Sequence, residues 1–335
     1  MILPIVAVVL GLGVLVWSAD KFVDGAVGIA KFCGMSTLLI GMVIVGFGTS
    51  APEMVVSAIS AMQNAPELAL GNAYGSNIAN IALILGLTAV ISPVFVVRKA
   101  LKRDLPILLA VTALSIFLAS DASIGRLDGV LLLLVFAGVM GFNIVSELRQ
   151  KKSVAVEEPG EAESGEKLSL GKSILWLVLG LALLVASSRA LVWGAVEIAR
   201  ALGVSDLLIG LTIVAVGTSL PELASSIAAA RKGENDLAFG NIIGSNLFNT
   251  LLVVGIAATI APMNSFEQSV FNRDMPVMAL LTVLLLLFGL PVRKKRLDAD
   301  GHRLGRINRI EGSVFLAVYI GYIGVLIAQA TGVLK

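Results

Sequence analysis

Long apolar stretches separated by short polar breaks run along almost the whole chain. A helix needs about 20 apolar residues to cross a bilayer, and the chain holds ten segments of this kind. They are roughly residues 2–30, 37–62, 68–91, 104–120, 127–147, 173–199, 206–230, 236–261, 274–290 and 310–331. The pattern predicts an all-α polytopic membrane protein with ten transmembrane helices, the first being a true span and not a cleaved signal peptide.

Composition supports the same class of protein. Hydrophobic residues make up 57% of the 335 positions and charged residues 14%, whereas soluble domains carry about 25% charged residues. The net charge of +2 gives no reason to expect a nucleic-acid partner. The chain has one cysteine, Cys33, and one histidine, His302, which lies in a basic polar stretch. An internal disulfide and a Cys/His metal site are therefore excluded.

The two halves of the chain are copies of each other. Residues 38–93 align without a gap to residues 207–262 at an offset of 169, with 26 identities in 56 positions. Five spans per half is an odd number, so the second half starts on the opposite side of the membrane and the repeat is inverted. We therefore divide the chain into a first five-helix repeat at 1–147, a charged linker at 148–172 and a second repeat at 173–335.

The positions of Lys and Arg predict the orientation. Loops on one side of the ten-span arrangement carry 19 of these residues, including the basic run Arg293–Arg296, and the other side carries 4. The positive-inside rule then places the linker in the cytoplasm and both termini outside the cell membrane.

The second span of each half contains a carboxylate deep in apolar sequence. Gly48-Thr49-Ser50-Ala51-Pro52-Glu53 recurs as Gly217-Thr218-Ser219-Leu220-Pro221-Glu222. A charged side chain near the bilayer centre costs about 2.5–3.5 kcal/mol even on the lenient insertion scale. One such glutamate could be a structural ion-pair partner of Lys21 or Arg189, but two at matching positions indicate cation binding.

Proline within these phrases predicts two broken helices. Each proline removes an amide donor and disfavours helix in the preceding residue, so we expect unwound stretches at 46–51 and 215–220, each followed by a half-helix. Thr and Ser stand where a helix N-cap would lie. Free carbonyls and carboxylates would form an all-oxygen cage, which suits hard cations such as Ca²⁺ and Na⁺.

The third span of each half adds polar groups on one helix face. Ser76 and Asn80 are four residues apart, as are Ser245 and Asn249, so each pair shares a face. On a membrane helix, such residues commonly serve close packing and interhelical hydrogen bonds. Beside the two acids, we expect them to supply further oxygens to the same centre.

These paired phrases resemble the two α-repeats of the sodium/calcium exchanger family, within the cation/Ca²⁺ antiporter superfamily. The resemblance covers essentially the whole chain and is to short prokaryotic members. It implies ten helices in an inverted 5 + 5 repeat, with helices 2 and 7 broken around four central ion sites.

The family pattern also implies a ligand set. Glu53 and Glu222 would bind Ca²⁺ and share Na⁺, with backbone carbonyls from Thr49 and Thr218 for Ca²⁺. Carbonyls of Gly46 and Ala215 would serve outer Na⁺ sites. The remaining side-chain ligands would be Ser50, Ser219, Ser76, Ser245, Asn80 and the residue at Asn249. Several members have aspartate at the position of Asn249, and in the potassium-dependent branch that aspartate is tied to K⁺ use.

We therefore expect a secondary antiporter that exchanges Na⁺ for Ca²⁺ by alternating access, with the first span of each half moving. No cofactor or enzymatic activity is expected, and one chain within the lipid bilayer should suffice. An H⁺-coupled or K⁺-dependent exchanger of the same superfamily is the alternative within transport, and a cation channel is the alternative of another class. Ion fluxes under separate gradients would distinguish these three.

Overall fold

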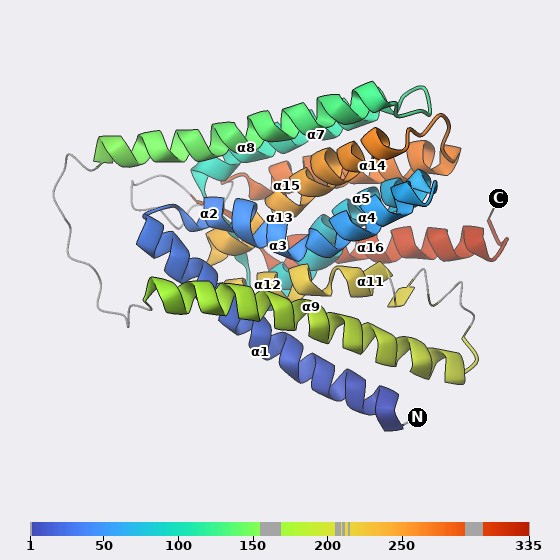
Figure 1. The fold of residues 1–335 in the computed structure, drawn as a ribbon, viewed down its shortest axis with the longest axis horizontal. Helices are drawn as coiled ribbons and strands as arrows, with labels where there is room; N and C mark the ends of the chain where they lie inside the picture. Colours follow the sequence, from blue (N-terminus) through green and yellow to red (C-terminus); the bar gives the residue numbers. More distant parts are fainter. Residues whose placement is uncertain are drawn as a thin grey trace.

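The structure is a computed structural model that describes residues 2–154, 169–204, 209, 212–213, 215–291 and 304–334. Most of the predicted linker, the basic run Arg293–Arg296 and His302 lie outside the described residues. The described chain is almost entirely helical, as predicted, and forms an elongated bundle (Figure 1).

The helices of the first half include several π-helical turns, labelled η, that interrupt the α-helices. The elements are α1 (Ile2–Cys33), α2 (Thr37–Ile40), η1 (Gly41–Val45), α3 (Gly46–Thr49), α4 (Ala51–Met62), α5 (Pro66–Ala79), η2 (Asn80–Leu85), α6 (Gly86–Ile91), η3 (Ala100–Asp104), α7 (Leu105–Leu118) and α8 (Arg126–Val154).

The second half repeats this order over its described residues. Its elements are α9 (Leu170–Ala201), α11 (Ala215–Thr218), α12 (Leu220–Arg231), α13 (Asn235–Leu247), η5 (Phe248–Val253), α14 (Val254–Ile260), η6 (Val270–Asp274), α15 (Met275–Gly289) and α16 (Arg309–Ala330). Two three-residue strands, β1 (Val94–Val96) and β2 (Gly305–Ile307), pair antiparallel with Val94 opposite Ile307.

Seven described helices are long and apolar enough to cross a membrane, and the residues from Thr37 to Met62, which bend by 46°, pass the same test as a pair of helices. Of the ten predicted segments, 104–120 corresponds to η3 and α7, and 206–230 is only partly described. Among the long candidate spans, those containing α5 and α13 are the most buried. Helices near the centre of the bundle therefore carry the Ser and Asn residues singled out above.

The predicted unwound stretches at 46–51 and 215–220 are wrong over most of their length. Residues 46–49 and 215–218 are α-helical, and the interruptions are confined to Ser50 and Ser219. Ser50, with φ −84° and ψ 1°, is enough to turn the chain into α4. Since proline removes one amide and restricts only one neighbour, a single non-helical residue accommodates it without unwinding a turn.

The first helices of the two halves pack against each other through equivalent residues. A Cβ on Gly11 would lie 3.2 Å from the Leu191 side chain, and a Cβ on Gly180 would lie 2.8 Å from the Phe22 backbone. Gly180 and Leu191 follow Gly11 and Phe22 by the same offset of 169 residues. The α1–α9 contact thus pairs the halves reciprocally, and small residues let the helices approach closely.

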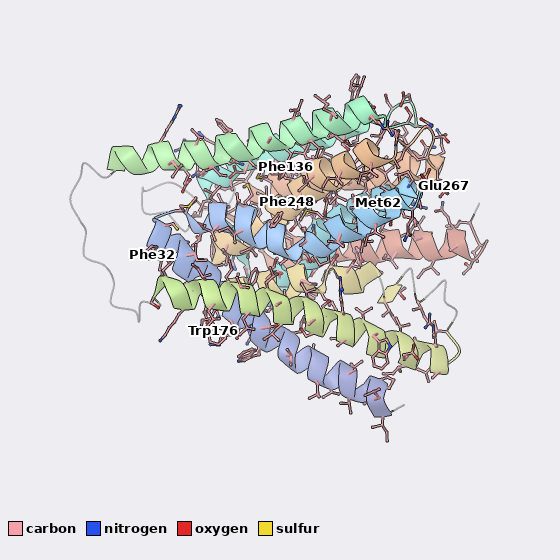
Figure 2. The ribbon with its side chains drawn as sticks, viewed as in Figure 1. Phe32, Met62, Phe136, Trp176, Phe248 and Glu267 are labelled. Carbon is pink, nitrogen blue, oxygen red and sulfur yellow. The ribbon has the colours of Figure 1, made fainter. Side chains whose placement is uncertain are left out.

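The chain termini and the connections between helices lie at two opposite ends of the bundle. Figure 1 places both termini at the right-hand end of the view. Met62, at the end of α4, and Glu267, between α14 and η6, lie at that same end in Figure 2, whereas Phe32 near the end of α1 lies at the opposite end. The arrangement agrees with helices that cross between two faces.

Candidate ion-binding site

Glu53 and Glu222 each lie in the first turn of a helix that begins just after the break. Pro52 and Pro221 occupy the first turns of α4 and α12, where a missing amide costs nothing. Both glutamates are only 2% exposed. Ser50 lies three residues before Glu53 and donates its hydroxyl to Glu222, so the segment that carries the first acid lies against the second acid. Two like charges held close together in a dry environment repel strongly, and a cation between them removes that cost.

The serines before the prolines serve the site and do not cap their helices. Neither Ser50 nor Ser219 makes a side-chain capping hydrogen bond. Ser50 Oγ instead donates to Oε1 of Glu222 at 3.4 Å, which joins the first half to the acid of the second. Ser219 Oγ is buried and has no hydrogen-bond partner among the described residues. Both serines therefore stand at the predicted N-cap positions, but their hydroxyls do not cap the helix and are left available to the site.

The asparagines of the third spans lie in π-helical turns that pack against the acid-bearing helix of the opposite half. Asn80 begins η2, which packs against α12, the helix of Glu222. Asn249 lies in η5, which packs against α4, the helix of Glu53. Ser76 and Ser245 lie about one turn earlier on the same faces and are also buried. The asparagine-bearing turn of each half thus packs against the acid-bearing helix of the other half.

The π-helical turns are features that the sequence did not predict. Three of them, at residues 41–45, 80–85 and 248–253, lie immediately before the first break and at the two asparagines, and two others, η3 and η6, precede α7 and α15. A π-helical turn inside an α-helix is rare and is often found at a functional site. Apolar periodicity predicts a helix at these places, but it does not distinguish a wider turn from a regular one.

Several buried oxygens at the site have no hydrogen-bond partner within the described part of the chain. These are Oε2 of Glu53, Oε2 of Glu222, Oγ of Ser219, Oγ of Ser245 and Oδ1 of Asn249. Each buried polar atom without a partner costs about 1–3 kcal/mol. All five are oxygens on the acid-bearing segments or on elements that pack against them, and hard cations prefer oxygen ligands.

The backbone positions implied by the resemblance are the first and last residues of α3 and of α11. The Gly46 carbonyl accepts the Ser50 amide at 3.0 Å, so the chain does not free it by unwinding. A carbonyl has a second lone pair and can still accept a cation. Thr49 is fully buried beside Ser50, Ala215 begins α11 and Thr218 ends it.

Comparison with known proteins identifies the family. The family model described as sodium/calcium exchanger protein matches residues 3–145 and 172–328. The chain belongs to the sodium/calcium exchanger family. It is therefore a multi-pass membrane antiporter of the cation/Ca²⁺ class, and this family consists of transporters and not enzymes.

Relatives and solved structures agree over nearly the full length of this exchanger. It is 45% identical to antiporter CaxA of Alkalimonas amylolytica over 326 residues, covering 96% of this chain and 98% of the relative. It is 33% identical to sodium/calcium exchanger MaX1 of Methanosarcina acetivorans over 350 residues, covering 95% and 96%. The sodium-calcium exchanger NCX_Mj, soaked with zero Na⁺ and Ca²⁺, superposes with a TM-score of 0.79 at 32% identity, covering 97% of this chain and 99% of that one.

One residue that sequence reasoning missed links the exchanger's α9 to the second break. Ser188 Oγ donates to the Gly217 carbonyl at 3.0 Å. Pro221 stands four residues after Gly217 and has no amide to offer that carbonyl. The serine hydroxyl therefore replaces the missing helical hydrogen bond. The signal in the sequence was the proline, which predicts an unpaired carbonyl but not which side chain pairs with it.

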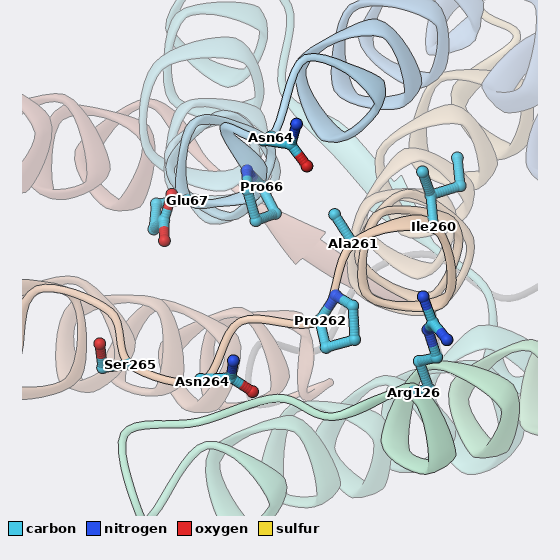
Figure 3. A pocket seen from close by; sticks show the side chains of 9 residues that line it. All are labelled: Asn64, Pro66, Glu67, Arg126, Ile260, Ala261, Pro262, Asn264 and Ser265. Atoms are coloured by element: carbon cyan, nitrogen blue, oxygen red, sulfur yellow. The ribbon is translucent and has the colours of Figure 1, made fainter.

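A separate polar pocket of about 350 Å³ lies at one end of the exchanger (Figure 3). It forms between the α4–α5 turn, the end of α14 and the start of α8, and Glu67 and Arg126 supply its charged groups. None of the residues implied as ligands lines it. The pocket is therefore distinct from the buried site at Glu53 and Glu222.

Proposed function

We propose that this exchanger couples Na⁺ movement in one direction to Ca²⁺ movement in the opposite direction through the site at Glu53 and Glu222. The observation that carries the proposal is the pair of buried carboxylates from opposite halves, linked through Ser50, with unpartnered hydroxyl and amide oxygens on the elements that pack against their helices. One Ca²⁺ neutralises both carboxylates. Two or three Na⁺ use the same oxygens, so the two loads compete and exchange becomes obligatory.

The proposed ligands are those implied by the family resemblance. Side chains of Ser50, Ser219, Ser76, Ser245, Asn80 and Asn249 surround the two acids, with carbonyls of Thr49, Thr218, Gly46 and Ala215. NCX_Mj was soaked with Na⁺ and Ca²⁺ in a structure that superposes on this chain with a TM-score of 0.78. An amide at Asn249 adds no third negative charge, which favours K⁺-independent exchange.

The architecture that accompanies this function is ten spans in two inverted repeats, 1–147 and 173–335, joined by a cytoplasmic linker. Reciprocal α1–α9 contacts support the inverted repeat. So does a second reciprocal pairing: Val94 pairs with Ile307, while Met263, 169 residues after Val94, pairs with Ile124. With the positive-inside rule, both termini lie outside the cell membrane, and a complete site within one chain supports function as a monomer.

Unequal cover at the two ends of the site supports alternating access. In one half-to-half contact, α1 packs along α12, and Ala228 on α12 is 7% exposed. In the equivalent place, α9 makes no comparable packing along α4, and Ile59, the residue equivalent to Ala228, is 48% exposed. Leu237 at the covered end is 1% exposed and the equivalent Leu68 is 66% exposed. In an inverted repeat, exchanging the roles of the halves opens one end and closes the other. We infer that α1 and α9 slide together, and that the covered end faces the cytoplasm.

Uptake of ⁴⁵Ca²⁺ into Na⁺-loaded proteoliposomes tests the proposal. An outward Na⁺ gradient should drive uptake, and Glu53→Gln or Glu222→Gln should abolish it because neither variant can neutralise Ca²⁺ with paired charges. Glu67→Gln, an exposed carboxylate in the separate pocket, is the matched control and should retain uptake.

The gradients also separate the alternatives. Uptake driven by a pH gradient without Na⁺ would favour proton coupling, and a requirement for K⁺ would favour the potassium-dependent branch. Ca²⁺ flux that needs no counter-ion would indicate a channel. Near-normal Na⁺-driven uptake in either glutamate variant would refute the assignment of the site.

A further inference from the structure

Asn241 is a buried amide that none of the implied ligand positions includes. It lies on α13, is 1% exposed, and bonds to both halves of the exchanger. Its Nδ2 donates to Ser226 Oγ at 3.0 Å and to Ser225 Oγ at 3.2 Å. Its Oδ1 accepts from Thr49 Oγ1 at 3.2 Å. The side chain therefore links α12, the helix of Glu222, to the end of α3 in the other half.

Glycines bring Asn241 to this position. A Cβ on Gly240 would lie 2.3 Å from the Leu38 carbonyl oxygen, and a Cβ on Gly244 would lie 2.2 Å from the Met42 carbonyl oxygen. The backbone of α13 consequently lies directly against α2 and η1 of the first half. At this distance a short amide can reach Thr49 on one side and α12 on the other.

The contacts of Asn241 form part of a closed loop around the ion-binding site. Thr49 precedes Ser50, and the Ser50 hydroxyl donates to Glu222. Ser225 and Ser226 lie about one turn after Glu222 on α12 and bond to Asn241, which returns to Thr49. Any shift of Asn241 would therefore change where the Thr49–Ser50 segment stands relative to Glu222.

We propose that Asn241 is a positioning residue that sets the spacing of the two half-sites and thereby the affinity for Ca²⁺. It acts through Thr49 on one half and through the two serines on the other, and it does not itself bind the ion. The inference rests on the proposed function only in treating the glutamate pair as the Ca²⁺ site. Ca²⁺ binding can be measured separately from Na⁺-driven transport, so the two can fail independently.

Asn246 offers a matched control on the same helix. It is also an asparagine, is 2% exposed, and donates its amide to the carbonyl of Ile242 within α13 at 2.7 Å. Its replacement removes a buried amide of equal size without removing a bond between halves. A general effect of losing a buried asparagine would therefore appear in both variants, and a positioning effect only in Asn241→Ala.

The experiment measures the Ca²⁺ dissociation constant of detergent-purified protein by calorimetry and, in parallel, half-saturating Ca²⁺ for uptake. Asn241→Ala should weaken both by about fivefold, the factor expected for losing the hydrogen bond to Thr49 that joins the halves, and Asn246→Ala should change them by less than twofold. Thr49→Val keeps the backbone carbonyl, removes only the hydroxyl and should reproduce the fivefold loss. If one bond is responsible, the double variant Asn241→Ala/Thr49→Val should be no weaker than Asn241→Ala alone.

If the double variant loses about 25-fold in Ca²⁺ affinity, the two single losses multiply and the proposal is overturned. Equal losses of Ca²⁺ affinity in Asn241→Ala and Asn246→Ala would also overturn it. If Asn241→Ala does not fold, as judged by gel filtration, Thr49→Val alone decides: unchanged Ca²⁺ affinity would overturn the role. Wild-type protein that binds Ca²⁺ but shows no Na⁺-driven uptake would refute the proposed coupling and leave the Asn241 measurement valid.

Discussion

Lys232 provides the sharpest test of how the covered end of the exchanger stays closed. It follows α12, and its Nζ lies 2.7 Å from Asp24 Oδ1, 2.7 Å from the Asp20 carbonyl oxygen and 3.8 Å from Asp20 Oδ1. Both aspartates lie on α1, the helix that covers α12. Equivalent positions in the other half hold Gln63, Arg189 and Trp193, which cannot form the same ion pairs. We predict that Lys232→Gln favours the state in which α1 has left α12.

The expected size of this shift follows from how exposed the ion pairs of Lys232 are. The Lys232 and Asp24 side chains are 30% and 35% exposed, and Asp20 is 51% exposed, so solvent screens these pairs. Exposed ion pairs are each worth about 0.2–1 kcal/mol, and two pairs with one carbonyl contact should together contribute about 1 kcal/mol. That free energy shifts a two-state equilibrium about fivefold. The change should therefore be measurable without abolishing either state.

Cysteine accessibility measures the shift. Ala229 lies on α12 beneath α1 and is 1% exposed, so Ala229→Cys in a Cys33→Ser background should react with a membrane-impermeant maleimide only when the covered end opens. In inside-out vesicles, Lys232→Gln should raise the labelling rate about fivefold. Asp24→Asn should raise it similarly, and Lys232→Arg should leave it near the starting rate because the charge is kept.

Lys31→Gln is the control, since this lysine at the end of α1 has no ion-pair partner among the described residues. An equal labelling rate in Lys232→Gln and Lys31→Gln would refute the reasoning. So would faster labelling from the outer face of right-side-out vesicles, because the covered end would then not be cytoplasmic.

Two further predictions concern the contact between halves and the charge of the site. Gly244→Ala would place a Cβ 2.2 Å from the Met42 carbonyl oxygen. Such overpacking costs about 1–3 kcal/mol or more, so this variant should have a lower melting temperature and slower Ca²⁺ uptake. The control Gly324→Ala, whose Cβ would have no described atom within 4 Å, should change neither quantity. Asn249→Asp should make Ca²⁺ uptake fall as pH rises from 6 to 8, because a third buried carboxylate must hold a proton when Ca²⁺ neutralises two; pH-independent uptake would contradict this.

The sequence determined the class of protein and the chemistry of its centre. Apolar runs of span length require a bilayer because no soluble core could hide them, and the buried carboxylates Glu53 and Glu222 require a cation because isolated charge in a dry environment is costly. The offset of 169 residues predicted that both acids stand at equivalent places. These conclusions depend on composition and spacing, which are local properties of the chain.

Only the tertiary structure decided how the halves meet. The sequence predicted an unwound segment at 46–51, but close packing against α13 keeps residues 46–49 helical and confines the break to Ser50. It did not predict that Ser50 bonds to Glu222, that Ser188 pairs with the Gly217 carbonyl, or that Asn241 bridges the halves. Each bond joins residues 29 to 192 positions apart, and no periodicity along the chain encodes which helices approach closely enough to form it.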